Sequence, residues 1–124
     1  MITIGFIGTG LMGLPMAKNI LKSGFKLKAF NRSIEKAEPL KELGAEISKS
    51  ISDVVKDSDF VITMLTDDSA VDAITSSTDF LNNLKSGSTV IDMSSVKPTT
   101  AIKHRENLKS KNVNYLDAPV SGGP

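Results

Sequence analysis

The sequence predicts an α/β protein built on a doubly wound parallel sheet in three layers. Three observations predict this fold. Short apolar runs alternate with amphipathic segments of helix length, the pattern that joins parallel strands through right-handed crossovers. The run Phe60–Leu65 is apolar almost throughout, as strands buried on both faces are. A glycine-rich segment, Gly8–Gly13, directly follows the first apolar run.

Six segments are expected to form strands because they are short, apolar and rich in residues that favour sheets. They are Ile2–Ile7, Lys26–Phe30, Ala45–Ser48, Phe60–Leu65, Thr89–Met93 and Val113–Leu116.

The segments between these runs are expected to form helices. The first has apolar side chains at spacings of one, three and four residues, and it stops at Lys22–Gly24 with a basic residue and a glycine. The segment Ile34–Leu43 contains Pro39, so a break or kink is expected near Glu38. The last, Pro98–Lys111, opens with proline and closes with basic residues, as helices prefer.

Length, composition and charge narrow the class of protein. The 124 residues suggest one domain, and 40% hydrophobic with 23% charged residues is ordinary for a globular chain. There is no cysteine, so neither disulfides nor thiolate chemistry is available. The net charge of +1 comes without a basic stripe, which argues against a nucleic-acid partner. No apolar run is long enough to span a membrane and no signal pattern opens the chain, so a cytoplasmic protein is expected.

The segment Gly8-Thr9-Gly10-Leu11-Met12-Gly13 carries the strongest functional signal. It lies between an expected strand and an expected helix, which is the context that the dinucleotide fingerprint requires. Gly8 would permit the tight turn, Gly10 the close approach of a pyrophosphate, and Gly13 the packing of helix on strand. The alternative is a turn that merely joins strand to helix. A P-loop is excluded because no Gly-Lys-Ser/Thr follows.

The end of the second expected strand bears on the choice of cofactor. Asn31 stands where NAD-binding folds usually place an acid, and Arg32 could offer its guanidinium to a 2′-phosphate. Ser33 would share that contact or cap the next helix. These residues favour NADP, with NAD as the second choice. The alternative is that Asn31 is a turn residue and Arg32 an ordinary surface charge.

Three further strand ends carry polar or small residues: Met64–Asp67, Asp92–Ser95 and Asp117–Gly123. Ligands bind outside the carboxyl ends of the strands in sheets of this kind. Serine, glycine and aspartate also favour turns whatever the function, so composition leaves a ligand site and plain turn chemistry equally open.

Few residues are candidates for acid–base chemistry or metal binding. The single histidine, His104, lies in a charged run and is expected on a solvated helix face without a catalytic role. Lys97 stays a candidate by its position near a strand end. A solvated face, and no metal site, is also expected for four aspartates: Asp67, Asp68, Asp72 and Asp79.

With these motifs in view, the chain resembles the N-terminal domain of the β-hydroxyacid dehydrogenases. This family includes 3-hydroxyisobutyrate dehydrogenase, 2-hydroxy-3-oxopropionate reductase and 6-phosphogluconate dehydrogenase. The segment Phe6–Asn19 resembles the family's N-terminal signature, and Asn31–Ser33 resembles the cofactor-selecting segment of NADP-using members. Met64–Thr66 is similar to the loop beside the two riboses, and Asp117–Gly123 to the substrate-binding motif.

The resemblance implies a Rossmann-type domain over residues 1–124 and a set of site residues. The cofactor-binding set is Gly8, Thr9, Gly10, Leu11, Met12, Gly13, Asn31, Arg32, Ser33, Met64, Leu65, Thr66 and Ser95, the last beside the nicotinamide. The substrate-binding set is Ser121, Gly122 and Gly123.

The implied activity is hydride transfer between NADP and a small β-hydroxyacid or semialdehyde, with a homo-oligomer as a further expectation. The family's catalytic lysine lies on a later helix, near the start of a helical domain, and no position here matches it. We therefore expect a fragment, with the sheet incomplete at its C-terminus and no turnover by the chain alone. The alternatives are an inactive dinucleotide-binding module or sensor and, less favoured by Asn31, a flavoprotein.

Overall fold

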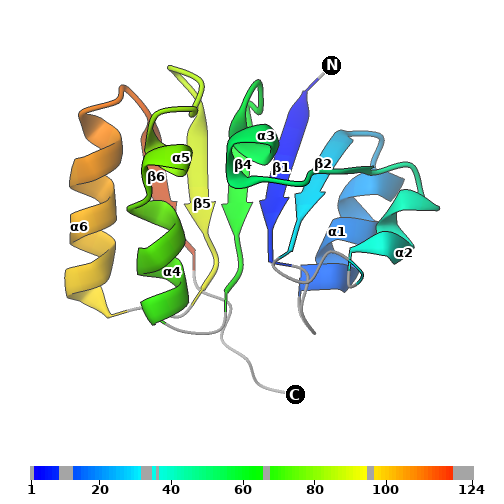
Figure 1. Cartoon of the computed structure of the whole chain (residues 1–124), viewed down its shortest axis with the longest axis horizontal. Coiled ribbons are helices and arrows are strands. Elements are labelled where there is room, and N and C mark those ends of the chain that lie inside the picture. The colour runs from blue at the N-terminus through cyan, green and yellow to red at the C-terminus, as the bar shows by residue number, and fades with distance from the viewer. Residues whose placement is uncertain are drawn as a thin grey trace.

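The structure is a computed structural model that describes residues 2–8, 13–31, 35, 37–65, 68–94 and 97–118. Six parallel strands form one sheet in the order β3-β2-β1-β4-β5-β6 (Figure 1). The strands are β1 (Thr3–Ile7), β2 (Lys26–Phe30), β3 (Glu46–Ile47), β4 (Phe60–Thr63), β5 (Thr89–Asp92) and β6 (Asn114–Asp117). From β1, the strands β2 and β3 are added on one side of the sheet, and β4, β5 and β6 are added on the other. This is the strand order of dinucleotide-binding folds.

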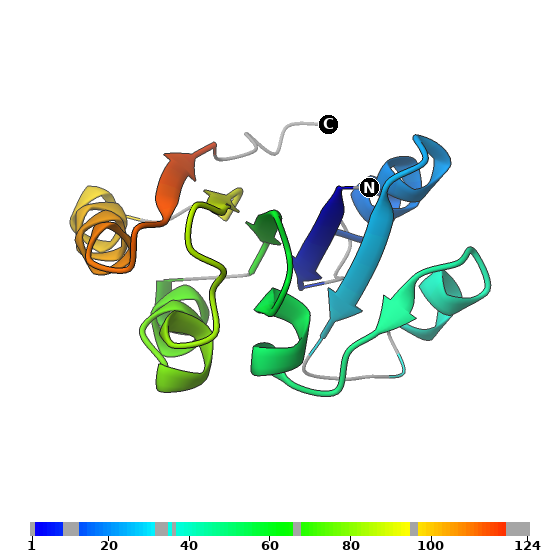
Figure 2. The ribbon, with the colours of Figure 1, turned by 90° about the horizontal axis from the view of Figure 1, so that it is seen from above.

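Six helices are described beside the sheet. They are α1 (Gly13–Lys22), α2 (Glu38–Lys41), α3 (Ile51–Val55), α4 (Asp68–Thr75), α5 (Thr78–Leu81) and α6 (Pro98–Lys109). Figure 2 shows α1 and α2 on one face of the sheet and α3, α4, α5 and α6 on the other. The predicted three-layer Rossmann-type sheet is therefore confirmed.

Two apolar clusters hold these layers together, one on each face of the sheet. Phe6 of β1 and Leu40 of α2 belong to the first cluster, which also contains Ala17 of α1. Ile7 lies in the second, together with Leu108 of α6. Because side chains alternate along a strand, the neighbours Phe6 and Ile7 supply opposite clusters. This explains why the central strands read as continuous apolar runs.

Glycine lets α3 approach the middle of the sheet. A Cβ added to Gly5 of β1 would lie 2.4 Å from the Val54 carbonyl oxygen and 2.9 Å from Ser58 Oγ. Contacts that short are not tolerated, so the separation between β1 and α3 depends on the missing side chain.

All six strands were predicted, with differences only at their ends. β4 ends at Thr63, so Met64 and Leu65 lie beyond it, and β3 contains two residues of the predicted Ala45–Ser48. β3 lies at the edge of the sheet and pairs only with β2, through Lys28 and Ala29.

The expected break near Glu38 is confirmed. Helix α2 begins there, with Pro39 in its first turn, where a missing backbone N–H costs no helical hydrogen bond.

Candidate functional site: the carboxyl edge of the sheet

The carboxyl ends of all strands meet at one edge, which faces downward in Figure 1. At its centre, where β1 and β4 lie side by side, Gly8 follows β1 and Met64 follows β4. The Gly8 N–H donates to the Phe30 carbonyl oxygen at 2.9 Å, and the Met64 N–H donates to that of Ile7 at 2.9 Å. The two outgoing segments therefore start from fixed positions on either side of the switch point, where ligands of such sheets bind.

Gly8 satisfies two demands that only glycine meets. Its φ is +96°, and a Cβ there would lie 2.1 Å from the Met64 carbonyl oxygen and 3.2 Å from Leu65 Cδ2. A side chain at this position would clash with the segment that follows β4. The geometry agrees with a tight turn at Gly8, while its contact with a pyrophosphate stays a prediction.

Helix α1 begins at the same edge. Its first residue is Gly13, and Ala17, one turn later, is fully buried in the first cluster. The first amides of a helix have no partners within it, and the positive end of its dipole lies there, so this end favours an anion. Asn31 follows β2 directly and is half-buried at the neighbouring strand end.

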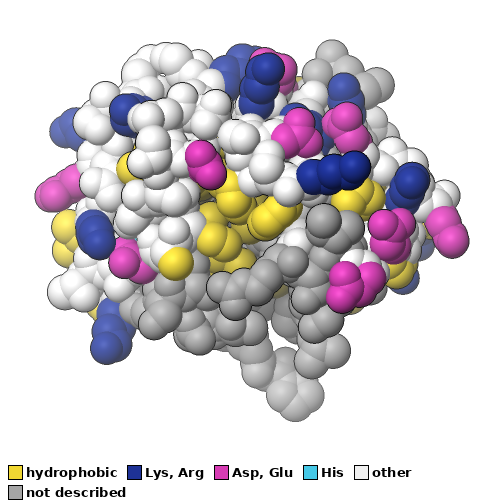
Figure 3. All heavy atoms as spheres, viewed as in Figure 1, with side chains coloured by type: hydrophobic (Ala, Val, Ile, Leu, Met, Phe, Trp, Pro, Cys, Tyr) yellow, Lys and Arg dark blue, Asp and Glu magenta, His cyan; other side chains and the backbone are white. Residues whose placement is uncertain are grey.

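Figure 3 shows apolar side chains gathered in a hollow between α3 and α4, next to the carboxyl edge. Partly buried apolar side chains that pack against the second cluster include Phe30, Ile51 and Leu65. Phe30 and Leu65 end or follow the strands on either side of β1. A flat apolar group held at this edge would meet side chains rather than water.

A buried carboxyl group organises the edge on the β5 side. Asp92, 1% exposed, accepts hydrogen bonds at Oδ1 from Thr63 Oγ1 and from the Ser94 N–H, both at 3.0 Å. The Ser94 hydroxyl in turn accepts from the Leu65 N–H at 2.7 Å. The segments after β4 and β5 are therefore joined through side chains and not only through the sheet.

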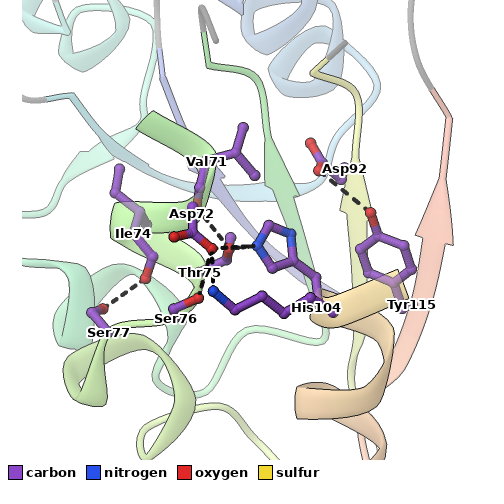
Figure 4. A network of polar contacts seen from close by, with 10 residues as sticks. Val71, Asp72, Ile74, Thr75, Ser76, Ser77, Asp92, His104 and Tyr115 are labelled. Carbon is purple, nitrogen blue, oxygen red and sulfur yellow. Dashed lines mark hydrogen bonds and ion pairs between the residues drawn. The ribbon is translucent and has the colours of Figure 1, made fainter. Parts of the chain in front are cut away.

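The strand β6 reaches the same carboxyl group. The Tyr115 hydroxyl lies 3.4 Å from Asp92 Oδ2, and both side chains appear in Figure 4. Burial raises the pKa of Tyr115 well above its usual range, and the charge of Asp92 adds to the effect. The Ala118 N–H also donates to the Asp92 carbonyl oxygen at 2.9 Å, which holds the start of the segment after β6.

The sequence placed Asp92–Ser95 at a strand end, and the resemblance implied a specific role for Ser95 alone. Ser95 lies outside the described residues, whereas Asp92 and Ser94 are both buried at this edge. The spacing Asp-x-Ser was the available signal, because an aspartate often accepts from the backbone N–H two residues later.

The expectation that His104 lies on a solvated helix face was wrong. Its side chain is 1% exposed and faces inward from α6 with Ala101 and Leu108, three residues before it and four after it. His104 Nε2 lies 2.8 Å from Thr75 Oγ1 (Figure 4). Because that hydroxyl donates to the Val71 carbonyl oxygen at 2.6 Å, His104 Nε2 is the donor of the pair. The imidazole therefore joins α6 to α4.

The charged neighbours of His104 are exposed, as a solvated face requires. Lys103 Nζ and Asp72 Oδ1 are 2.8 Å apart, with about half of each side chain exposed. The hydrogen bond from Lys103, helped by one from Ser76, lowers the pKa of Asp72 below its usual value. His104 Nε2 is 3.6 Å from the same Asp72 oxygen. Lys97 is exposed at the start of α6, and Asp79 is exposed on α5.

The part of the chain that the structure describes holds no group of three or more metal-binding side chains. Nor does any helix in that part have the length and apolarity needed to cross a bilayer.

Several predicted site residues lie outside the described residues, and their roles stay predictions. They are Thr9, Gly10, Leu11, Met12, Arg32, Ser33, Thr66, Ser95, Ser121, Gly122 and Gly123. The described members, Gly8, Gly13, Asn31, Met64 and Leu65, lie together at the carboxyl edge between β2 and β4.

Comparison with known proteins agrees with this geometry. A family described as the NAD binding domain of 6-phosphogluconate dehydrogenase matches residues 3–124. The chain belongs to this family. The NAD-binding family supplies the Rossmann-type domain of NAD(P)-dependent oxidoreductases, as the resemblance implied.

Individual relatives match over nearly the whole of this chain. The oxidoreductase YkwC of Bacillus subtilis is 42% identical over 98% of this chain and 42% of its own length. The structure of Mycobacterium tuberculosis 3-hydroxyisobutyrate dehydrogenase with L-serine superimposes with a TM-score of 0.91 at 32% identity, over 99% of this chain and 42% of that one. Psf3, in complex with NADP+ and 2-OPP, gives a TM-score of 0.90 at 30% identity, over 97% of this chain and 43% of that one. The chain therefore spans about two fifths of the length of these relatives.

Proposed function

We propose that residues 1–124 form the NADP-binding domain of an oxidoreductase that transfers a hydride between NADP(H) and a small β-hydroxyacid or its semialdehyde. The observation that carries the proposal is the turn at Gly8, at the switch point of a sheet ordered 3-2-1-4-5-6. A Cβ there would lie 2.1 Å from the Met64 carbonyl oxygen, so only glycine lets the segment after β1 lie this close to the segment after β4. The membership of an NAD-binding family and the likeness to a 3-hydroxyisobutyrate dehydrogenase support the same conclusion.

Each part of the edge would meet one part of the dinucleotide. The turn at Gly8 and the start of α1 would hold the pyrophosphate with backbone amides and a favourable dipole. The segment after β4, with Met64 and Leu65, would line the riboses, and the apolar hollow beside it suits the adenine. Bound there, the cofactor supplies the hydride chemistry of its nicotinamide ring, while the protein supplies position.

The preference for NADP rests on the end of β2. Asn31 carries no charge to repel a 2′-phosphate, and Arg32 would supply a guanidinium to it. Psf3, which shares 30% identity with this chain, binds NADP+.

A titration of this chain with NADP and with NAD tests the cofactor proposal. NADP is expected to bind more tightly, and Arg32→Ala should weaken NADP by about 1.5–3 kcal/mol, the worth of a charged hydrogen bond, while NAD changes little. Lys26→Ala removes an exposed positive charge at the other end of β2 and serves as the control. Equal losses for both cofactors in Arg32→Ala would end the selectivity argument, and failure of both cofactors to bind the wild type would end the proposal.

The substrate side would lie after β6, where Ser121, Gly122 and Gly123 would bind a carboxylate through hydroxyl and backbone donors. We expect no turnover from these residues alone, because no position matches the family's catalytic lysine. NADPH-linked reduction of a semialdehyde by the purified chain would contradict that expectation.

A further inference from the structure

Asp92 occupies a place in the fold that the proposed function does not use. It ends β5, is buried, and accepts hydrogen bonds from three different segments. Thr63 donates from β4, the Ser94 N–H from the segment after β5, and the Tyr115 hydroxyl from β6. A carboxyl group placed in a sheet core costs desolvation, and three donors from separate elements offset that cost only while all of them keep their positions.

The contacts of Ser94 carry this restraint toward the cofactor side. Its N–H is held by Asp92, which orients the hydroxyl so that it accepts from the Leu65 N–H at 2.7 Å. Leu65 is the second residue after β4, and its Cδ2 is among the atoms that a Cβ on Gly8 would meet. A path of contacts, buried at Asp92 and Ser94 and partly buried at Leu65, therefore runs to the wall of the Gly8 turn.

The contact with Tyr115 carries the restraint in the other direction. Tyr115 lies on β6, two residues before Asp117, where the predicted substrate segment begins. The Ala118 N–H is held by the Asp92 backbone carbonyl at 2.9 Å, so the same residue restrains both the strand and its exit.

We propose that Asp92 is a positioning residue that ties the cofactor-binding segment after β4 to the strand that leads into the substrate segment. The proposal rests on the proposed function, since it requires a dinucleotide at the β1–β4 edge. Binding there moves or tightens Leu65, and the Ser94–Asp92 contacts transmit the change to Tyr115. Asp92 itself need touch neither ligand.

The chain provides a built-in probe for this coupling. Tyr115 is the only tyrosine and there is no tryptophan, so a labelled tyrosine ring gives NMR signals from this position alone. Within the sheet, β6 is separated from β1 by β4 and β5, so the Tyr115 ring does not lie beside the Gly8 turn.

The test is an NADP titration followed by calorimetry and by the Tyr115 ring resonances, on four variants beside the wild type. Asp92→Leu removes both acceptor oxygens, and Ser94→Ala removes the acceptor of the Leu65 N–H together with the 3.5 Å hydrogen bond that the Ser94 hydroxyl donates to the Thr63 carbonyl oxygen. Asp92→Asn keeps one carbonyl oxygen for Thr63 and Ser94 and is the conservative rescue. Ser58→Ala removes a buried hydroxyl just before the amino end of β4, away from the cofactor edge. It is the matched control for a loss of stability without a change at the site.

NADP is expected to shift the Tyr115 resonances of the wild type, Asp92→Asn and Ser58→Ala. If the binding-competent arrangement falls to about one tenth of the population, Asp92→Leu and Ser94→Ala bind NADP about tenfold more weakly. Their NADP-induced shift should also shrink. Should Asp92→Leu fail to fold, Ser94→Ala decides the matter.

A wild-type affinity and an unchanged Tyr115 shift in Ser94→Ala would overturn the proposal, as would a wild-type Tyr115 ring that does not respond to bound NADP. If Ser58→Ala weakened NADP as much as Ser94→Ala, the effect would be one of stability and the proposal would fall. A wild type that binds neither NADP nor NAD would refute the proposed function itself, an outcome visible before any variant is compared.

Discussion

Replacement of Gly8 by alanine separates the two reasons for a glycine at the cofactor turn. The φ of +96° costs an alanine roughly 1–2 kcal/mol. The added Cβ would lie 2.1 Å from the Met64 carbonyl oxygen, and forcing such a contact costs roughly a further 1–3 kcal/mol. The free energy of unfolding should therefore fall by about 2–5 kcal/mol, which corresponds to a Tm lower by about 8–20 °C for a domain of this size.

Two other glycines supply controls for each reason alone. Gly24 has a φ of +91° with nothing within 4 Å of an added Cβ, so Gly24→Ala should cost only the conformational part. Gly5 has no positive φ, but its added Cβ would meet the Val54 carbonyl oxygen at 2.4 Å, so Gly5→Ala should cost only the steric part. The entropy that alanine removes from the unfolded chain is common to all three variants and cancels in the comparison.

Thermal unfolding followed by circular dichroism measures these losses, and calorimetry measures NADP binding to the variants below their Tm. Gly8→Ala should lose the most stability, and it alone should also lose NADP affinity, because Gly5 and Gly24 lie away from the carboxyl edge. Equal Tm losses in Gly8→Ala and Gly24→Ala would refute the inferred close approach of the Gly8 and Met64 segments.

Two further predictions concern polar contacts outside the site. The ion pair with Lys85 lowers the pKa of Asp59, so its contribution to stability is full above the ordinary aspartate pKa and is lost as pH falls through the lowered value. Unfolding of Asp59→Asn across acidic pH should lack this dependence, and an unchanged acid profile would contradict it. Thr75→Val leaves the buried His104 N–H without its acceptor and should cost about 1–3 kcal/mol in thermal unfolding. Lys103→Ala removes only an exposed ion pair and should cost about 0–1 kcal/mol; equal losses would show that the His104 contact contributes no more than that exposed ion pair.

Periodicity predicted the elements because each depends on local chemistry. The apolar run Phe60–Leu65 identified the central strand, and its end was overestimated by two residues because hydrophobicity does not stop where pairing stops. Pro39 indicated the start of α2 through its missing N–H, a property that needs no tertiary information. The glycine segment after the first strand indicated the turn at Gly8 for the same reason.

The site was predicted less completely, because it is assembled from residues distant in sequence. Asp92 and Thr63 are separated by 29 residues, and Asp92 and Tyr115 by 23, so no local pattern brings them together. His104 was misplaced because its sequence neighbours are charged. Successive residues of a helix point about 100° apart, so exposed Lys103 and Arg105 say little about the residue between them.

The sequence by itself determined which segments form strands and helices, that the strands are parallel, and that a glycine follows the first strand. Those properties follow from backbone conformation and from the spacing of apolar side chains along a single segment. Only the tertiary structure decided that Asp92, Ser94 and Leu65 form one path of contacts and that His104 joins two helices. A polar group can be buried only where a segment distant in sequence supplies a hydrogen-bond donor or acceptor. The order of the strands in the sheet decides which segments become neighbours.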